Sequence, residues 1–201
     1  LILAIPLLCA VQFTQQTLAA EPIDIGTRLE LFVDDYLIDQ LKGDAKQITQ
    51  LPKPHEVVLT TDKPWEGNTS AYYTVFRNGD LFRMYYRGSH WDTKSQKATH
   101  PEVTCYAESK DGIHWTKPEL GLFEFNGSKQ NNIVWDGIGT HCFAVFKDGN
   151  PACLPAARYK AISRGRPRGK KGLYIFKSPD GIHWSLMHAE PVITDGAFDS
   201  Q

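Results

Sequence analysis

An acidic residue follows an aromatic one at three places along the chain, each time before a small residue. Paired carboxyl groups can act as acid and as base or nucleophile on a glycosidic bond. Flat aromatic faces suit the C–H groups of a sugar. We therefore predict Glu66 and Asp199 as catalytic carboxylates, and Trp65, Trp135 and Asp136 as substrate-binding residues. The three triplets are Trp65-Glu66-Gly67, Trp135-Asp136-Gly137 and Phe198-Asp199-Ser200.

Each of these residues also has a structural alternative. Tryptophans that recur can fill the core of a repeating unit, and the acids can cap turns. The motif Asp111-Gly112-Ile113-His114-Trp115 returns residue for residue at 180–184. For this motif we favour the structural alternative, because catalysis rarely needs the same group twice at symmetric positions. Its Asp-Gly pair predicts a turn, and its tryptophan a filler of the core.

The motifs share one period of about 70 residues. Trp65 is echoed by Trp135, Phe76 by Phe146 and Asp111 by Asp180, which are offsets of 70, 70 and 69 residues. A fixed period indicates one supersecondary unit stacked on copies of itself. The acidic residues therefore recur once per unit.

Within each unit the local signals are strands and turns. Aromatic and β-branched runs predict four strands per unit, and Asn78-Gly79 predicts the turn of a hairpin. Helical periodicity is weak throughout. Four antiparallel strands form a blade of a β-propeller, so we predict an all-β fold with two complete blades and the start of a third. The predicted strands are 72–76, 81–87, 103–109 and 114–116, then 142–146, 159–163, 173–177 and 183–187.

Two adjacent acids, Asp34 and Asp35, lie in the apolar run Leu31–Ile38 ahead of the first blade. Acids are costly to bury unless they are used or paired. If the run is a strand, alternation directs one carboxylate to the propeller channel and the other outward. We predict both as catalytic candidates. The stretch 34–41 could equally form a strand and loop or the chain's one helix.

Residues 1–20 combine an apolar run with the small residues Ala19 and Ala20, which is typical of part of a secretory signal. A membrane anchor is the alternative, but the run is short and contains Pro6 and several glutamines. We expect a secreted or periplasmic protein in which residues 21–201 are the N-terminal part of a single propeller domain. The net charge of −1 argues against nucleic-acid partners and against membrane binding after the signal is removed.

No cofactor or metal is expected. No Cys-x-x-Cys spacing occurs, and Cys142 and Cys153 flank a predicted turn where they could form a disulfide. His141 precedes an inner strand and could line the channel. The basic stretch 158–171 could be a solvated hairpin tip or a contact for polyanions.

Several motifs resemble exported bacterial proteins of the five-bladed β-propeller glycosidase superfamily, which includes the invertase, levansucrase and arabinanase families. The similar segments are 31–38, 64–66, Arg83 to Gly88 with Arg87 included, 106–115 and 196–201. The resemblance implies a funnel at the propeller axis with three carboxylates from different blades. Asp34 or Asp35 would supply one and Asp199 another. Independently of the resemblance, we predict Arg87 and His141 as substrate-binding residues. The Asn-Asp-Pro-Asn-Gly signature of the invertases is absent.

Two functions follow from these observations. The first is an exported glycoside hydrolase that cleaves a poly- or oligosaccharide with carboxylates at the channel mouth. The second is a non-catalytic propeller that binds glycans or serves as a scaffold, since a fold does not determine a function. Carboxylates occupied as structural caps would favour the binding protein.

Overall fold

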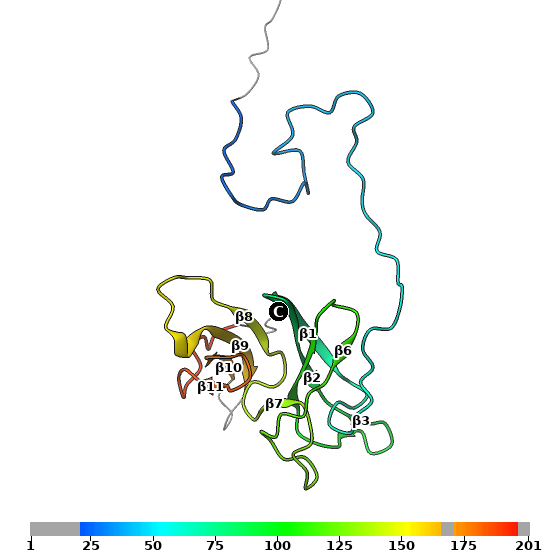
Figure 1. The fold of residues 1–201 in the computed structure, drawn as a ribbon, viewed down its shortest axis with the longest axis vertical. Coiled ribbons are helices and arrows are strands. Elements are labelled where there is room, and N and C mark those ends of the chain that lie inside the picture. Colours follow the sequence, from blue (N-terminus) through cyan, green and yellow to red (C-terminus); the bar gives the residue numbers. More distant parts are fainter. Residues whose placement is uncertain (1–20, 166–170, 197–201) are drawn as a thin grey trace, which may run out of the picture. The chain divides into compact units, whose positions relative to one another are not determined.

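The computed structural model describes residues 21–165 and 171–196, and the chain forms two compact units, residues 1–55 and 56–201 (Figure 1). The described part of the first unit consists of bends and turns. Leu31–Ile38 forms neither the strand nor the helix that the sequence analysis left open. A strand needs a neighbouring strand to pair its backbone N–H and C=O groups. Here the side chains of Phe32 and Val33 are exposed, so the segment is not packed against a sheet. Instead, the backbone N–H of Tyr36 donates to Asp34 Oδ1 at 3.0 Å.

The second unit is all-β, as predicted. Among the described residues the one helical element is the short 3-10 turn η1 (Pro155–Ala157). No helix in the described part of the chain has the length and apolar character needed to cross a bilayer. The strands are β1 (Ala71–Asn78), β2 (Leu81–Gly88), β3 (Trp91–Asp92), β4 (Lys97–Ala98), β5 (Val103–Ser109), β6 (Trp115–Thr116), β7 (Ile133–Asp136), β8 (Ala144–Lys147), β9 (Tyr159–Gly165), β10 (Gly172–Ser178) and β11 (Ser185–Leu186).

Two antiparallel sheets contain the eight predicted strands in chain order. The first runs β1-β2-β5-β6 and the second β8-β9-β10-β11. β7, which begins after the linker between the two strand sets, also pairs with β5, and β3 and β4 form a small separate hairpin. The ends of the long strands lie close to the predicted ones, whereas β6 and β11 are only two residues long. Gly79 in the β1–β2 turn has a φ of 64°, as an Asn-Gly hairpin requires.

The recurring Asp-Gly-Ile-His-Trp motif forms the same turn in both sheets. Oδ1 of Asp111 accepts hydrogen bonds from the backbone N–H groups of residues 113 and 114, at 2.9 and 2.8 Å, and Oδ2 lies 2.7 Å from the imidazole of His114. Asp180 makes the matching contacts with residues 182 and 183 at 2.8, 2.8 and 2.7 Å. The motif is therefore structural in both places, as predicted.

One face of the first sheet packs against one face of the second. The shared core is largely aromatic and includes Tyr85, Tyr106, Phe143, Phe176 and Trp184. The second motif turn adds polar contacts, because Tyr85 donates its hydroxyl to the carbonyl of Gly181 at 2.8 Å and Arg83 donates to the carbonyl of Asp180. The opposite face of the first sheet is covered by residues of the flanking loops, among them Trp65, Phe123 and Phe125.

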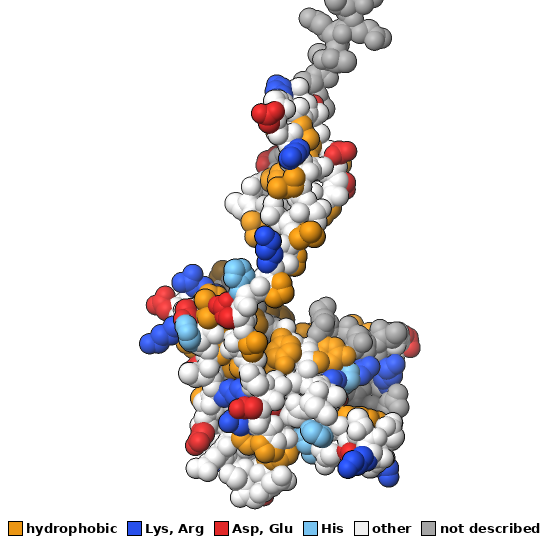
Figure 2. Space-filling model, turned by 90° about the vertical axis from the view of Figure 1, so that its right-hand side faces the viewer, with side chains coloured by type: hydrophobic (Ala, Val, Ile, Leu, Met, Phe, Trp, Pro, Cys, Tyr) orange, Lys and Arg blue, Asp and Glu red, His pale blue; other side chains and the backbone are white. Residues whose placement is uncertain are grey.

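Charged residues of both signs are interspersed over the surface of the second unit in the view of Figure 2. This distribution agrees with the net charge of −1 over the whole sequence. This face therefore has no large region that carries charge of a single sign. Any selectivity for charged ligands has to come from a few neighbouring side chains.

Asp180→Asn is expected to lower the free energy of unfolding by about 1 kcal/mol, the typical value of a capping carboxylate after allowance for solvent screening. Asp111→Asn is the matched control, because its turn makes the same internal bonds as the Asp180 turn, whereas the contacts with Arg83 and Tyr85 belong to the Asp180 turn. The loss should be smaller for Asp111→Asn. Urea unfolding of both variants measures the difference, and equal losses would contradict the role of the Asp180 turn in joining the sheets.

Stability should also fall in acid through Asp180. Burial raises the pKa of this carboxyl, but hydrogen bonds from His183 and Ile182 outweigh burial and lower the pKa below its ordinary value. A lowered pKa in the folded state stabilises the fold above the unfolded value of about 4, and this stabilisation is lost as the pH falls further. Urea unfolding at about pH 7 and about pH 3 should therefore show a smaller acid-induced loss in Asp180→Asn than in the wild type.

Candidate functional site

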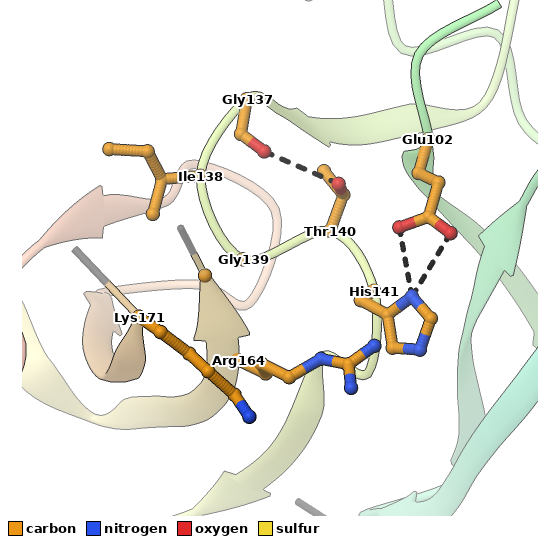
Figure 3. Close-up of a pocket in the computed structure, with 9 residues that line it drawn as sticks. Glu102, Gly137, Ile138, Gly139, Thr140, His141, Arg164 and Lys171 are labelled. Carbon is orange, nitrogen blue, oxygen red and sulfur yellow. Dashed lines mark hydrogen bonds and ion pairs between the residues drawn. The ribbon is translucent and has the colours of Figure 1, made fainter. Parts of the chain in front are cut away.

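A cleft of about 630 Å³ lies beside the interface of the two sheets (Figure 3). The loop between β7 and β8 lines it from Gly137 to His141, and the facing ends of β9 and β10 contribute Arg164, Gly165 and Lys171. Glu102, immediately before β5, completes the lining. Its volume falls in the range of small-molecule sites.

Three charged or polar side chains meet at one end of this cleft. Nδ1 of His141 lies 3.0 Å from both carboxylate oxygens of Glu102, as the dashed lines in Figure 3 show. Arg87 Nη1 lies 3.3 Å from Glu102 Oε1 and 3.2 Å from His141 Nδ1. The side chain of Arg87 is only 13% exposed, while Glu102 and His141 are 31% and 23% exposed. The latter two can therefore be reached from solvent.

The contacts of His141 Nδ1 bear on where the ring proton lies. A neutral imidazole carries its proton on one nitrogen and accepts on the other. Nδ1 faces the carboxylate symmetrically, so we place the proton there, and the close approach of Arg87 is then a contact between two donors. Nε2 has no hydrogen-bond partner among the described residues and can accept a hydroxyl proton from a ligand.

Tyr72 lies against the side chains of Arg87 and His141 because β1 is bulged. The pairing of β1 with β2 shifts register between Ala71 and Thr74, and Tyr72 has a φ of 57°. Positive φ is rare for a bulky residue, and such strain gathers at functional sites. The bulge brings the Tyr72 ring within 4.8 Å of the Arg87 guanidinium carbon and 5.0 Å of the His141 ring.

The β7–β8 loop, which carries His141, is held close to the second sheet. Gly139 has a φ of 85°, and a Cβ at this position would meet the ring of Phe176 at 2.6 Å. A larger residue would therefore push the loop away from β10. Thr140 supports the same loop by donating its hydroxyl to the carbonyl of Gly137 at 3.2 Å.

Glu66, predicted as catalytic, is fully buried and makes internal contacts. Its carboxylate accepts hydrogen bonds from Tyr86, Lys117 and the backbone N–H of Lys63, at 2.5, 2.7 and 3.0 Å. Burial raises the pKa of the Tyr86 hydroxyl, so that it remains a donor. These contacts are those of a structural group, and Glu66 is not among the residues that line the cleft.

Both predicted binding tryptophans lie partly buried against the core. Trp65 donates its indole N–H to Asn132 Oδ1 at 2.7 Å and packs edge-on against Phe125. Trp135 donates to the carbonyl of Ile138 at 2.7 Å and packs against Phe176. Their placement corresponds to the core alternative of the sequence analysis.

The structure brings together two of the predicted site residues, Arg87 and His141. Asp136 is exposed at the end of β7, next to the cleft loop. Asp34 and Asp35 are exposed within the first unit, and Asp199 lies outside the described residues.

The structure also bears on the disulfide, the metal ligands and the basic stretch considered in the sequence analysis. No disulfide joins Cys142 to Cys153, and Cys105 is buried in β5, where burial raises the pKa of its thiol. No cluster of three or more metal-ligating side chains occurs within 21–165 and 171–196. The basic stretch 158–171 spans the β9–β10 hairpin, whose residues 166–170 lie outside the described part.

Sequence reasoning missed Glu102 in the cleft and Tyr72 beside it, and it placed Arg164 and Lys171 only within the basic stretch 158–171. Glu102 lies in the segment between β4 and β5, which has no counterpart in the second strand set. Arg164 could have been found from its similarity to Arg87, since both directly precede a glycine at the end of a strand.

Glu66→Gln is expected to lower the free energy of unfolding by about 3 kcal/mol, because it removes the buried partner of the Lys117 ammonium. Glu119→Gln is the control, since Glu119 is exposed and lies two residues after Lys117 in the same loop. It should change stability by less than about 0.5 kcal/mol. Chemical denaturation measures both variants, and unchanged stability in Glu66→Gln would contradict a structural role.

Comparison with known proteins gives distant relatives. No protein-family model matches the chain. The uncharacterized proteins MT1551 and Rv1502 of Mycobacterium tuberculosis are 27% and 28% identical to it, each over 121 residues. The aligned region covers 57% of this chain and 33% of each relative, so the match spans about a third of the length of these curated proteins.

Proposed function

We propose that this chain belongs to an exported, carbohydrate-active β-propeller protein whose inter-sheet cleft binds a poly- or oligosaccharide. The observation that carries the proposal is the meeting of Arg87, Glu102 and His141 beside the ring of Tyr72. Sugars present hydroxyl groups that pair with charged and imidazole groups. They also present C–H faces that pack on aromatic rings.

The propeller is supported by the arrangement of the sheets. Each sheet contains a four-stranded antiparallel meander, to which β7 adds a fifth strand in the first sheet, and the first strands of the two meanders, β1 and β8, contact each other. Propeller blades are sheets of this kind, arranged around a channel. The cleft then lies between two consecutive blades, at the ends of their strands.

Binding is better supported than hydrolysis. A typical glycosidase flanks the scissile bond with two carboxyl groups, and Glu102 is the one carboxylate among the described residues that line the cleft. Glu66 is occupied by Lys117 and Tyr86. Hydrolysis is the second candidate, which the solvent-accessible carboxylate of Glu102 favours; Asp34, Asp35 and Asp199 remain the catalytic acids predicted from the sequence.

His141→Ala is expected to weaken glycan binding about tenfold, the typical effect of losing one hydrogen bond to a ligand. The intact protein should be titrated calorimetrically with arabinan, β-fructan, xylan and polygalacturonate. His188→Ala is the control, because His188 is exposed and does not line the cleft. No binding to any of these glycans by the folded wild type would refute the proposal.

Reducing-sugar release should be assayed in the same samples. Release that is lost in Asp199→Asn or Asp35→Asn would establish the hydrolase. Binding without release would leave the glycan-binding protein as the function.

A further inference from the structure

Glu102 and His141 form a pair that can move a proton as a unit. Nδ1 of His141 lies 3.0 Å from both carboxylate oxygens of Glu102, and Figure 3 shows this side of the ring facing the carboxylate. An unprotonated Nδ1 would direct its lone pair at both oxygens, which is why the proton is placed on this nitrogen. Arg87 Nη1 lies 3.3 Å from Glu102 Oε1, so the carboxylate serves two donors. A carboxylate that fixes this tautomer leaves Nε2 as the basic nitrogen.

The second nitrogen of His141 is the one that a reactant can use. The contacts that the structure gives this imidazole within the described residues are all made by Nδ1, and the side chain is 23% exposed. His141 and Glu102 both line the cleft. A water molecule bound beside the ring can therefore give its proton to Nε2, which is the action of a general base.

The loop that carries His141 also has unpaired backbone donors. Within the described part of the chain, the backbone N–H groups of Ile138, Gly139 and Thr140 have no hydrogen-bond acceptor. Gly139 and Thr140 are buried, and all three residues line the cleft. A backbone donor that lacks a protein partner in such a place needs an oxygen of water or of a ligand. Backbone N–H groups at a reaction site are the donors that stabilise the oxyanion formed when a nucleophile adds to a carbonyl carbon.

This combination suits an ester better than a glycosidic bond. A typical glycosidase supplies a carboxylic acid to protonate the leaving oxygen and a second carboxylate to complete the reaction. Addition of water to an acyl carbon needs one base and donors for the oxyanion. The described lining of the cleft contains one carboxylate, paired with one imidazole, and the free backbone donors of the loop.

We infer that the cleft hydrolyses an acyl ester on a sugar hydroxyl, such as an acetyl group, with His141 as general base and Glu102 as its positioning residue. Water adds to the acyl carbon while its proton passes to Nε2, and the charge that forms on the carbonyl oxygen is stabilised by the loop N–H groups. The bond from the acyl carbon to the sugar oxygen then breaks, and Nε2 returns the proton to that oxygen. One ester and one water give one carboxylic acid and one alcohol. The sugar part of the substrate rests on the proposed carbohydrate function.

The test measures ester hydrolysis by the intact protein. Acetate release is followed on acetylated xylan, and nitrophenol release on p-nitrophenyl acetate, which contains no sugar. His141→Ala should lower kcat on both by about hundredfold or more, the usual contribution of a general base, and added imidazole should restore part of the activity. Glu102→Gln should lower kcat on p-nitrophenyl acetate about tenfold or more, because the tautomer is no longer fixed, and leave KM unchanged.

His188→Ala and Glu119→Gln are the matched controls, because both residues are exposed and neither lines the cleft. Both variants should retain the wild-type rates. If His141→Ala fails to fold, His141→Asn provides the same comparison, since asparagine keeps a donor for Glu102 but has no basic nitrogen.

The outcomes separate the inference from the function on which its sugar part rests. Binding of xylan without turnover of either ester overturns the inference and supports carbohydrate binding. Turnover of p-nitrophenyl acetate that depends on His141, without binding or acetate release from any glycan, supports the dyad and overturns the carbohydrate function. Turnover that is unchanged in His141→Ala overturns the inference. Neither binding nor turnover overturns both.

Discussion

The burial of Tyr85 between the two sheets is the interaction on which the second unit depends. Its side chain is completely buried, and its ring contacts Phe76, Tyr106 and Trp184. A buried hydroxyl needs a partner, and Tyr85 finds it in the carbonyl of Gly181 on the opposite sheet. Packing and hydrogen bonding thus specify the same relative position of the sheets, which neither would specify as well alone.

The geometry of the cleft depends on this contact between the sheets. Alternate residues of a strand share a face, so Arg83, Tyr85 and Arg87 follow one another along the same side of β2. The first two hold the Asp180 turn, and the third reaches His141. The bulge at Tyr72 then supplies the aromatic wall. One row of side chains on β2 therefore joins the sheets at one end and forms the site at the other.

Sequence patterns predicted the second unit well because its signals are local. Alternating apolar residues and Asp-Gly or Asn-Gly turns specify hairpins over a few residues, and the eight strands followed from them. The Leu31–Ile38 run has a similar strand-like pattern of apolar residues. A strand also requires a neighbouring strand to pair with, and the local sequence does not show whether one is present. The pairing of Glu102 with His141 joins residues 39 apart, and the bulge at Tyr72 has no sequence signature. Both arise only from the packing of the sheets.

The contact between Tyr85 and Gly181 joins residues that are 96 positions apart, whereas neighbouring strands within each sheet follow one another closely in sequence. Contacts between distant residues close large loops and cost more chain entropy than local hairpins. The order of events in folding follows from this difference. We expect the hairpins of each sheet to form first, and the sheets to dock afterwards, because docking closes the longer loop. The cleft, which exists only after docking, is therefore among the last features of the protein to form.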